Sequence, residues 1–267
     1  MAIVSIIGAG RIGTALASRA EAAGQPVALI TRTEGWDRLS TREGPILVAV
    51  RNDGLADVVA RTPEARRADL VFLQNGAIRD RLAQLGVPDA DRGLIYFLVA
   101  QRGGPVVGGQ KSVFTGRHAA MVEHWFTSLG LAAEAVPREA FADWEWEKHV
   151  WIAAHGVLCP ALDATVGEIG TTHRGHLDTL VEEWAALGIA EWNVRTPPPA
   201  LVERLVMYSA EISDYKPSFK AYEDRNGWFI AVAAKHGLPA DRHVAWLERV
   251  DPALGDRARA ELKTLGR

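Results

Sequence analysis

Short apolar runs recur between residues 3 and 99, separated by glycine turns or by helix-forming segments. The runs occupy residues 3–7, 27–30, 46–50, 70–73 and 94–99, and valine, isoleucine, leucine and phenylalanine dominate them. Continuous apolar runs are typical of strands in a parallel sheet, because helices cover both faces of such a sheet. The pattern predicts a doubly wound α/β domain.

Glycine pairs follow the last of these runs. The pairs at 103–104 and 108–109 enclose a short apolar segment, and Ser112-Val113-Phe114-Thr115 comes next. This arrangement predicts antiparallel strands that close the sheet. A second phosphate-binding loop is the less favoured alternative, because no helix follows these glycines directly.

The first apolar run leads into a glycine-rich turn. The turn is Gly8-Ala9-Gly10-Arg11-Ile12-Gly13, and helix-forming residues begin at Thr14. Between a strand and a helix, the first glycine permits the tight turn, the second lets the backbone approach a pyrophosphate, and the third lets the helix pack on the strand. The amides at the helix N-terminus favour phosphate groups. We therefore predict that the six turn residues bind a dinucleotide.

The second half of the chain has helical patterns instead. They cover residues 138–158, 163–193, 200–213, 219–235 and 241–250, with a break at Pro197-Pro198-Pro199. We place a domain boundary near Pro137. The sequence thus predicts a Rossmann-type dinucleotide-binding domain at 1–137 and an all-helical substrate domain at 138–267. We expect the active site in the crevice between them, at the carboxyl ends of the strands.

The end of the second strand indicates which dinucleotide is bound. An acid at this place binds the ribose 2′-hydroxyl of NAD, whereas an arginine accepts the 2′-phosphate of NADP. The strand is followed by Thr31-Arg32, which favours NADP, although Glu34 two residues later leaves NAD open. Arg51, after the third strand, is either a second positive charge near the cofactor or a solvated surface arginine.

Composition narrows the possible partners to small molecules. The chain has 267 residues, 48% of them hydrophobic and 24% charged, and a net charge of -3. Its basic residues are dispersed, so we expect no nucleic-acid partner. No apolar run approaches the roughly 20 residues of a membrane span, and the apolar start lacks the basic segment of a signal peptide.

The cysteine and histidine content argues against disulfides and metals. A single cysteine, Cys159, excludes an internal disulfide and fits a reducing compartment. We expect it to be buried and inert. His173 and His176 lie three residues apart, but Gly175 between them and the missing carboxylate pattern argue against a metal site. We expect a cytoplasmic protein, with a homodimer as its candidate assembly.

Several of these motifs together resemble those of the ketopantoate reductases (2-dehydropantoate 2-reductases). The resemblance covers most of the chain. In the first domain it rests on the glycine turn, Arg32, residues 48–51 and, above all, Gln74-Asn75-Gly76 at a strand end. It implies that Gln74 and Asn75 contact the cofactor, and that Asn75 also reaches the substrate.

The helical domain carries the catalytic part of the resemblance. Trp146-Glu147-Lys148 and Val166-Gly167-Glu168-Ile169 are similar to the family's catalytic-lysine helix and the turn that follows it. Pro217-Ser218-Phe219 and Asn226-Gly227 resemble the serine that anchors the substrate carboxylate and the helix beyond it. The resemblance implies NADPH-dependent reduction of a 2-oxo acid, with Lys148 as proton donor, and a place in pantothenate biosynthesis.

The chain departs from the family around this lysine. The family has asparagines four and eight residues after it, where this chain has Ile152 and Gly156. The family's acidic residue falls on Ala221, and only a two-residue shift makes Glu223 the catalytic carboxylate. These departures put the substrate in doubt.

Helical spacing suggests what replaces the asparagines. Lys148, Ile152 and His155 share one face of an ideal helix. His155 is therefore a candidate substrate donor, although a structural core histidine is the favoured interpretation, and Gly156 leaves room for a bulkier substrate. Ser218 is equally well explained as a helix cap.

Two functions remain open at this stage. The first is an NADPH-dependent reductase of a 2-oxo acid or a related carbonyl, with a lysine as general acid. The second is a non-catalytic NADP-binding sensor that has lost its substrate site. The two missing asparagines favour the second, and the retained lysine favours the first.

Overall fold

The computed structural model describes residues 4–41, 43–108 and 110–265. The chain forms two compact units, Met1–Phe141 and Ala142–Arg267. The division falls within helix α6 (Arg138–Leu162), whose first residue follows Pro137.

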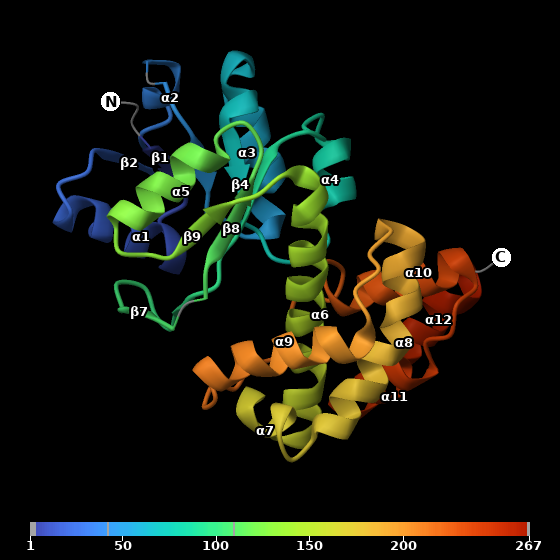
Figure 1. Ribbon diagram of the computed structural model, residues 1–267. Helices are drawn as coiled ribbons and strands as arrows, with labels where there is room; N and C mark the ends of the chain where they lie inside the picture. The colour runs from blue at the N-terminus through green and yellow to red at the C-terminus, as the bar shows by residue number, and fades with distance from the viewer. Residues whose placement is uncertain (1–3, 42, 109, 266–267) are drawn as a thin grey trace. The chain divides into compact units, whose positions relative to one another are not determined.

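The first unit is built on a seven-stranded sheet (Figure 1). Its strands, in spatial order, are β2 (Val27–Ile30), β1 (Val4–Ile7), β3 (Ile46–Val48), β4 (Leu70–Phe72), β5 (Asp91–Leu94), β8 (Ser112–Thr115) and β9 (Ala133–Ala135). Strands β1 to β5 are parallel, β8 is antiparallel to β5, and β9 is parallel to β8. The predicted doubly wound architecture is confirmed.

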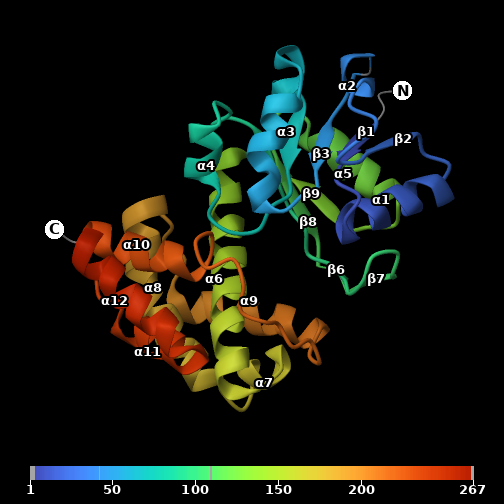
Figure 2. The same cartoon turned by 180° about the vertical axis from the view of Figure 1, so that it is seen from behind.

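Helices cover both faces of this sheet (Figures 1 and 2). On one face, α1 (Arg11–Ala22) and α5 (Ala119–Ser128) pack against Ile6 and Leu47. On the other, α2 (Arg38–Thr41), α3 (Leu55–Arg61) and α4 (Arg79–Gln84) pack against Ile7 and Val48. Successive strand residues point to opposite faces, so both must be apolar. This explains the continuous apolar runs.

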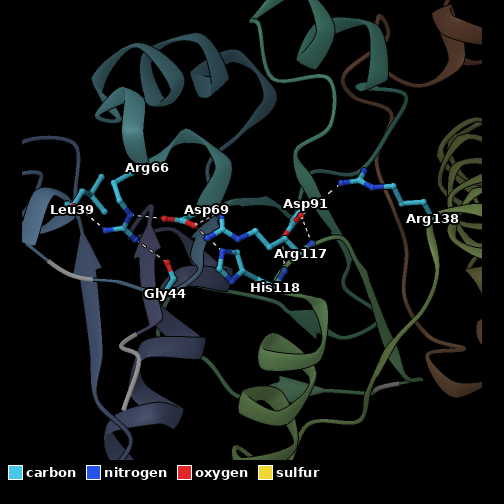
Figure 3. Close-up of polar contacts among 8 residues, drawn as sticks. All are labelled: Leu39, Gly44, Arg66, Asp69, Asp91, Arg117, His118 and Arg138. Atoms are coloured by element: carbon cyan, nitrogen blue, oxygen red, sulfur yellow. Dashed lines mark hydrogen bonds and ion pairs between the residues drawn. The ribbon is translucent and has the colours of Figure 1, made fainter.

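A polar network lies at the edge of the sheet where β4 and β5 begin (Figure 3). Asp69, just before β4, accepts hydrogen bonds from Arg66 at 2.5 Å and lies 2.8 Å from His118 Nε2. Burial raises the pKa of Asp69, but the hydrogen bonds from Arg66 and His118 outweigh it and hold the pKa below its ordinary value. Arg66 also donates to the carbonyls of Leu39 and Gly44, which ties the loop before β3 to this edge.

Asp91 extends the network to helix α5. Its carboxylate accepts the backbone N–H groups of Arg117 and His118, both at 2.7 Å, immediately before α5 begins. Gly116 has φ of +111°, and a Cβ there would lie 1.9 Å from Asp91 Oδ1. Only glycine therefore permits this carboxylate to satisfy the N-terminal amides of α5.

The second unit consists of helices packed around an aromatic core. Its helices after α6 are α7 (Val166–Gly170), α8 (Arg174–Trp192), α9 (Pro198–Glu211), α10 (Asn226–His236), α11 (Asp241–Val250) and α12 (Pro252–Leu265). Phe229 of α10 stacks on Trp184 of α8, with ring centroids 3.9 Å apart, and on His149 of α6 at 4.7 Å. All three side chains are buried, and they hold α6, α8 and α10 together.

Two predicted helices of the second half differ in the structure, and one helix there was not predicted. The predicted helix 163–193 is two helices, because a capping box between Thr165 and Glu168 starts α7 and Thr171 leaves the helical conformation. The predicted helix 219–235 begins only at Asn226, since Ala221 has φ of +52°. Helix α12 was not predicted.

The predicted strand 94–99 is also divided. Strand β5 starts earlier, at Asp91, whereas β6 (Leu98–Val99) pairs with β7 (Val106–Val107) in a separate two-stranded sheet. The antiparallel strand expected at 112–115 is β8, but β9 lies outside it in the sheet. Gly109 lies outside the described residues.

Candidate functional site

The glycine turn after β1 leaves space for a ligand where a side chain would close it. Gly8 has φ of +115°, and a Cβ on it would lie 2.8 Å from the Ala49 carbonyl oxygen. A Cβ on Gly13 would lie 1.8 Å from the Gly8 carbonyl oxygen, so this glycine brings α1 against the turn. Beside Gly10, by contrast, the nearest such atom is 4.0 Å away. The turn is therefore tight at its two ends and open in the middle.

This turn lies at the switch point of the sheet. The spatial order β2-β1-β3 means that the chain leaves β1 toward one side and returns to β3 on the other. Ligands of open α/β sheets bind where strand order reverses, outside the carboxyl ends of the strands. Helix α1 begins there at Arg11, with no side chain capping its N-terminus. Its free amides suit an anionic group.

The segment after β4 contributes two amides to the same edge. Gln74 donates from Nε2 to the carbonyls of Val48 and Val50, both at 2.9 Å, which fixes its side chain across the end of β3. The buried atoms Gln74 Oε1 and Asn75 Oδ1 have no hydrogen-bond partner among the residues that the structure describes. Buried polar atoms without a partner are costly, so both fit a site that a polar ligand completes.

Arg32 and Arg51, the two arginines predicted to lie near the cofactor, have different surroundings. Arg32 follows β2 and is exposed, and its carbonyl accepts a hydrogen bond from Arg61 at 2.7 Å. Glu34 lies in the same turn, with its backbone N–H donating to Thr31 Oγ1. Arg51, in contrast, pairs with the exposed Asp53 at 2.7 Å. Arg51 thus has a carboxylate neighbour that offsets its charge.

Lys148 lies inside the second unit, on α6. Its side chain is buried, and Nζ donates to the Tyr208 hydroxyl of α9 at 3.2 Å. Nζ also lies 4.4 Å from the centre of the Tyr208 ring and 5.2 Å from that of Trp151. Cation–π attraction from both rings stabilises an ammonium at this position. Tyr208 is not among the residues predicted from the sequence, although Leu201, Leu205 and Tyr208 recur on the buried face of α9.

Burial changes the protonation of Lys148. It lowers the pKa of the lysine to about 7, an effect that Glu147 opposes and Arg225 reinforces. Burial likewise raises the pKa of Glu147, which is ion-paired with Arg204. A lysine with a pKa near neutrality can both give and take a proton at physiological pH, which is what general acid–base chemistry requires.

Both ring nitrogens of His155 contact other groups of the second unit. Burial lowers its pKa to about 4, so the ring is neutral at physiological pH. Nδ1 donates to the Trp151 carbonyl at 2.9 Å, and Nε2 lies 3.1 Å from the Ser209 hydroxyl oxygen. With both nitrogens engaged by the fold, the ring has no donor left for a substrate. Ile152 is buried as well, and a Cβ on Gly156 would lie 3.9 Å from the Asn226 amide.

The other candidate residues of the second unit lie at its surface. Ser218 is exposed, and Glu223 forms an ion pair with Arg257 of α12 at 3.1 Å. Their catalytic and substrate-binding roles stay predictions. Cys159 is buried, and burial raises the pKa of its thiol to about 12, which makes it a poor nucleophile.

A cavity of about 440 Å³ lies between α7 and α9. Glu168 and Asp214 line it, together with threonine and serine hydroxyls. Two carboxylates would repel an anionic substrate, so we do not assign the cavity to one. In the described part of the chain, no cluster of histidine, cysteine and acidic side chains could hold a metal ion. None of the described helices is long and apolar enough to cross a membrane.

Known proteins resemble this chain in structure but not detectably in sequence. The sequence matches no protein-family model and no curated protein sequence. A D-mandelate dehydrogenase in complex with NADH has a TM-score of 0.74 and 16% identity, over 98% of this chain and 99% of that one. A PanE/ApbA family ketopantoate reductase from Ralstonia eutropha JMP134 has a TM-score of 0.69 and 18% identity, over 99% and 100%. A 2-dehydropantoate 2-reductase from Geobacter metallireducens GS-15 has a TM-score of 0.71 and 17% identity, over 94% and 99%. The whole chain therefore has the fold of the ketopantoate reductases and of D-mandelate dehydrogenase.

Proposed function

We propose that this protein is an NADPH-dependent reductase of a 2-oxo acid, a divergent relative of the ketopantoate reductases. The observation that carries the proposal is the buried Lys148, with a pKa of about 7 and a hydrogen bond to Tyr208. Burying a lysine costs free energy, and buried groups with shifted pKa values cluster at functional sites. The shared fold supports the proposal independently.

The first unit fits a nicotinamide dinucleotide. The open backbone at Gly10 and the free amides of α1 would hold the pyrophosphate, and Arg32 would meet a 2′-phosphate. The unpartnered oxygens of Gln74 and Asn75 would accept hydrogen bonds from the ligand. When bound, the reduced cofactor supplies the hydride.

The second unit supplies the proton. Reduction of a carbonyl leaves negative charge on its oxygen, and the Lys148 ammonium would stabilise this charge and then protonate the oxygen. Its pKa of about 7 means that the ammonium form is available at neutral pH and declines as the pH rises. We therefore expect kcat to fall above about pH 7.

The surroundings of Lys148 favour a substrate with an apolar substituent. Ile152 and Gly156 replace polar side chains, and the rings of Trp151 and Tyr208 lie beside the ammonium. We expect NADPH oxidation to be faster with aryl or branched 2-oxo acids, such as phenylglyoxylate, than with ketopantoate. An unpaired polar group of the substrate costs about 1–3 kcal/mol, or roughly tenfold to a hundredfold in kcat/KM.

A panel of 2-oxo acids at a fixed NADPH concentration tests both the activity and this preference. Ketopantoate turned over faster than every other compound would contradict the apolar pocket. The sensor hypothesis, which the loss of polar positions at 152 and 156 favours, predicts NADPH binding without turnover of any compound in the panel.

The cofactor preference is tested at Arg32. A charge-assisted contact to the 2′-phosphate is worth about 1.5–3 kcal/mol. We therefore expect NADPH to bind at least tenfold more tightly than NADH, and Arg32→Ala to remove most of the difference. Tryptophan fluorescence titration measures both affinities. The control is Arg117→Ala, which removes an exposed arginine from the opposite edge of the sheet. Equal affinities of the native protein for both cofactors would refute the assignment.

A further inference from the structure

Helix α9 presents a row of polar side chains to α6. Arg204 pairs with Glu147, Tyr208 accepts from Lys148, and Ser209 accepts from Trp151 Nε1 at 2.9 Å. Four residues after Trp151, His155 meets the same Ser209 hydroxyl. The residues of α6 and of α9 that make these contacts lie about one helical turn apart. The side chains of α9 therefore form polar contacts along the face of α6 that carries Lys148.

Two positions of α6 beyond Lys148 carry no polar side chain. Ile152, one turn beyond Lys148, cannot accept a hydrogen bond, and Gly156 has no side chain at all. The Tyr208 hydroxyl, 3.2 Å from Nζ, is a polar group from another helix that reaches the ammonium. Tyr208 is only 3% exposed and Lys148 4%, so water competes little for this contact.

The charged groups near Lys148 and Tyr208 have opposite effects on the protonation of Lys148. Glu147 on α6 favours the ammonium form of Lys148, and Arg225, which precedes α10, disfavours it. Glu147 is itself engaged by Arg204. Burial raises the pKa of Tyr208, and Glu211 and Tyr215 act in the same direction, so the phenol stays protonated at neutral pH. Tyr208 therefore contributes an oxygen acceptor and a ring face rather than a charge.

We propose that Tyr208 is the positioning residue of the proton donor: its hydroxyl oxygen and ring face hold Lys148 in place and favour the ammonium form. The proposal rests on the proposed function, since it assigns Tyr208 a task in the same reaction.

The test is Tyr208→Phe, which keeps the ring and removes the hydroxyl. Loss of a hydrogen bond to a charged group should lower the pKa of Lys148 by about one unit. Because the general acid acts in its protonated form, kcat at pH 7 should fall about fivefold, and the difference should close at pH 5, where both proteins carry the ammonium. A purely structural defect would lower kcat equally at all pH values.

The pKa of Lys148 can be measured without turnover. NMR titration of protein with ¹³C-labelled lysine follows it directly, and the resonance is assigned by its absence in Lys148→Met. The matched control is Tyr222→Phe, which removes a buried hydroxyl bonded to Glu261 at 2.9 Å in the same unit and should leave the Lys148 titration unchanged.

The outcomes separate this proposal from the proposed function. An unchanged Lys148 titration in Tyr208→Phe overturns the role of Tyr208, whatever the activity. A shifted titration in a protein that reduces no 2-oxo acid supports the coupling of the two residues and overturns the reductase. If Tyr208→Phe does not fold, Tyr208→Met, which also lacks the hydroxyl, takes its place, and an unchanged Lys148 titration in that variant overturns the proposal.

Discussion

Lys148→Met is expected to lower kcat with the best 2-oxo acid by about 10²–10⁴-fold, the usual contribution of a positioned general acid. Methionine fills nearly the same volume as lysine but has no proton to give. The loss should appear in kcat more than in KM, because the proton is needed mainly in the transition state. Steady-state NADPH oxidation across the substrate range measures both constants.

Two further variants make the result specific to this lysine. NADPH affinity, read by tryptophan fluorescence, should be nearly unchanged, because the glycine turn belongs to the other unit. Lys148→Arg should restore little activity, since guanidinium stays protonated and has a different shape. Lys263→Met, at an exposed position of α12, should behave as wild type. A Lys148→Met protein with near-normal kcat would remove this lysine from the mechanism.

The first unit could be predicted from the sequence because its signals are local. Ile6 and Ile7 face opposite sides of the sheet, and each meets its own layer of helices. A run of adjacent apolar residues therefore indicates a strand that helices cover on both faces. The glycine turn is local in the same way, since Gly13 packs against the carbonyl of Gly8 within the same six residues.

The second unit was less predictable because a short break divides one of its predicted helices and contacts between helices decide other details. Thr165 and Glu168 form the capping box that starts α7, and the helical conformation ends at Thr171. A periodic apolar pattern does not show such a break. Helix α12 carries many charges and few large apolar residues, so its hydrophobic pattern is weak.

The environment of Lys148 was beyond the reach of sequence reasoning. Its partner Tyr208 lies 60 residues away on another helix. The spacing on α6 correctly places His155 near the lysine's face, but only the structure shows that Ser209 and the Trp151 carbonyl engage both of its ring nitrogens. Helical periodicity predicts which residues share a face. It does not predict which groups from other helices meet them.

Lys148→Met should also raise the stability of the folded protein. Lys148→Met removes a buried amine whose pKa is about 7 in the folded protein, against an ordinary value of 10.5. Keeping this amine buried costs free energy at pH 7, and we expect the variant to unfold with a free energy about 2–4 kcal/mol higher. Loss of activity with a gain in stability is typical of a residue kept for function.

The pH dependence of this gain identifies its cause. Between pH 7 and 10.5 the unfolded chain binds the lysine proton more strongly than the folded protein does, so wild-type stability rises with pH through this window relative to the variant. The stability gap should therefore be largest at or below pH 7 and smaller by about 2 kcal/mol at pH 9. Urea unfolding of both proteins at the two pH values measures it. A gap that does not change with pH would show that packing, rather than the buried amine, determines the effect, and Lys148 would then lack the shifted pKa on which its catalytic role depends.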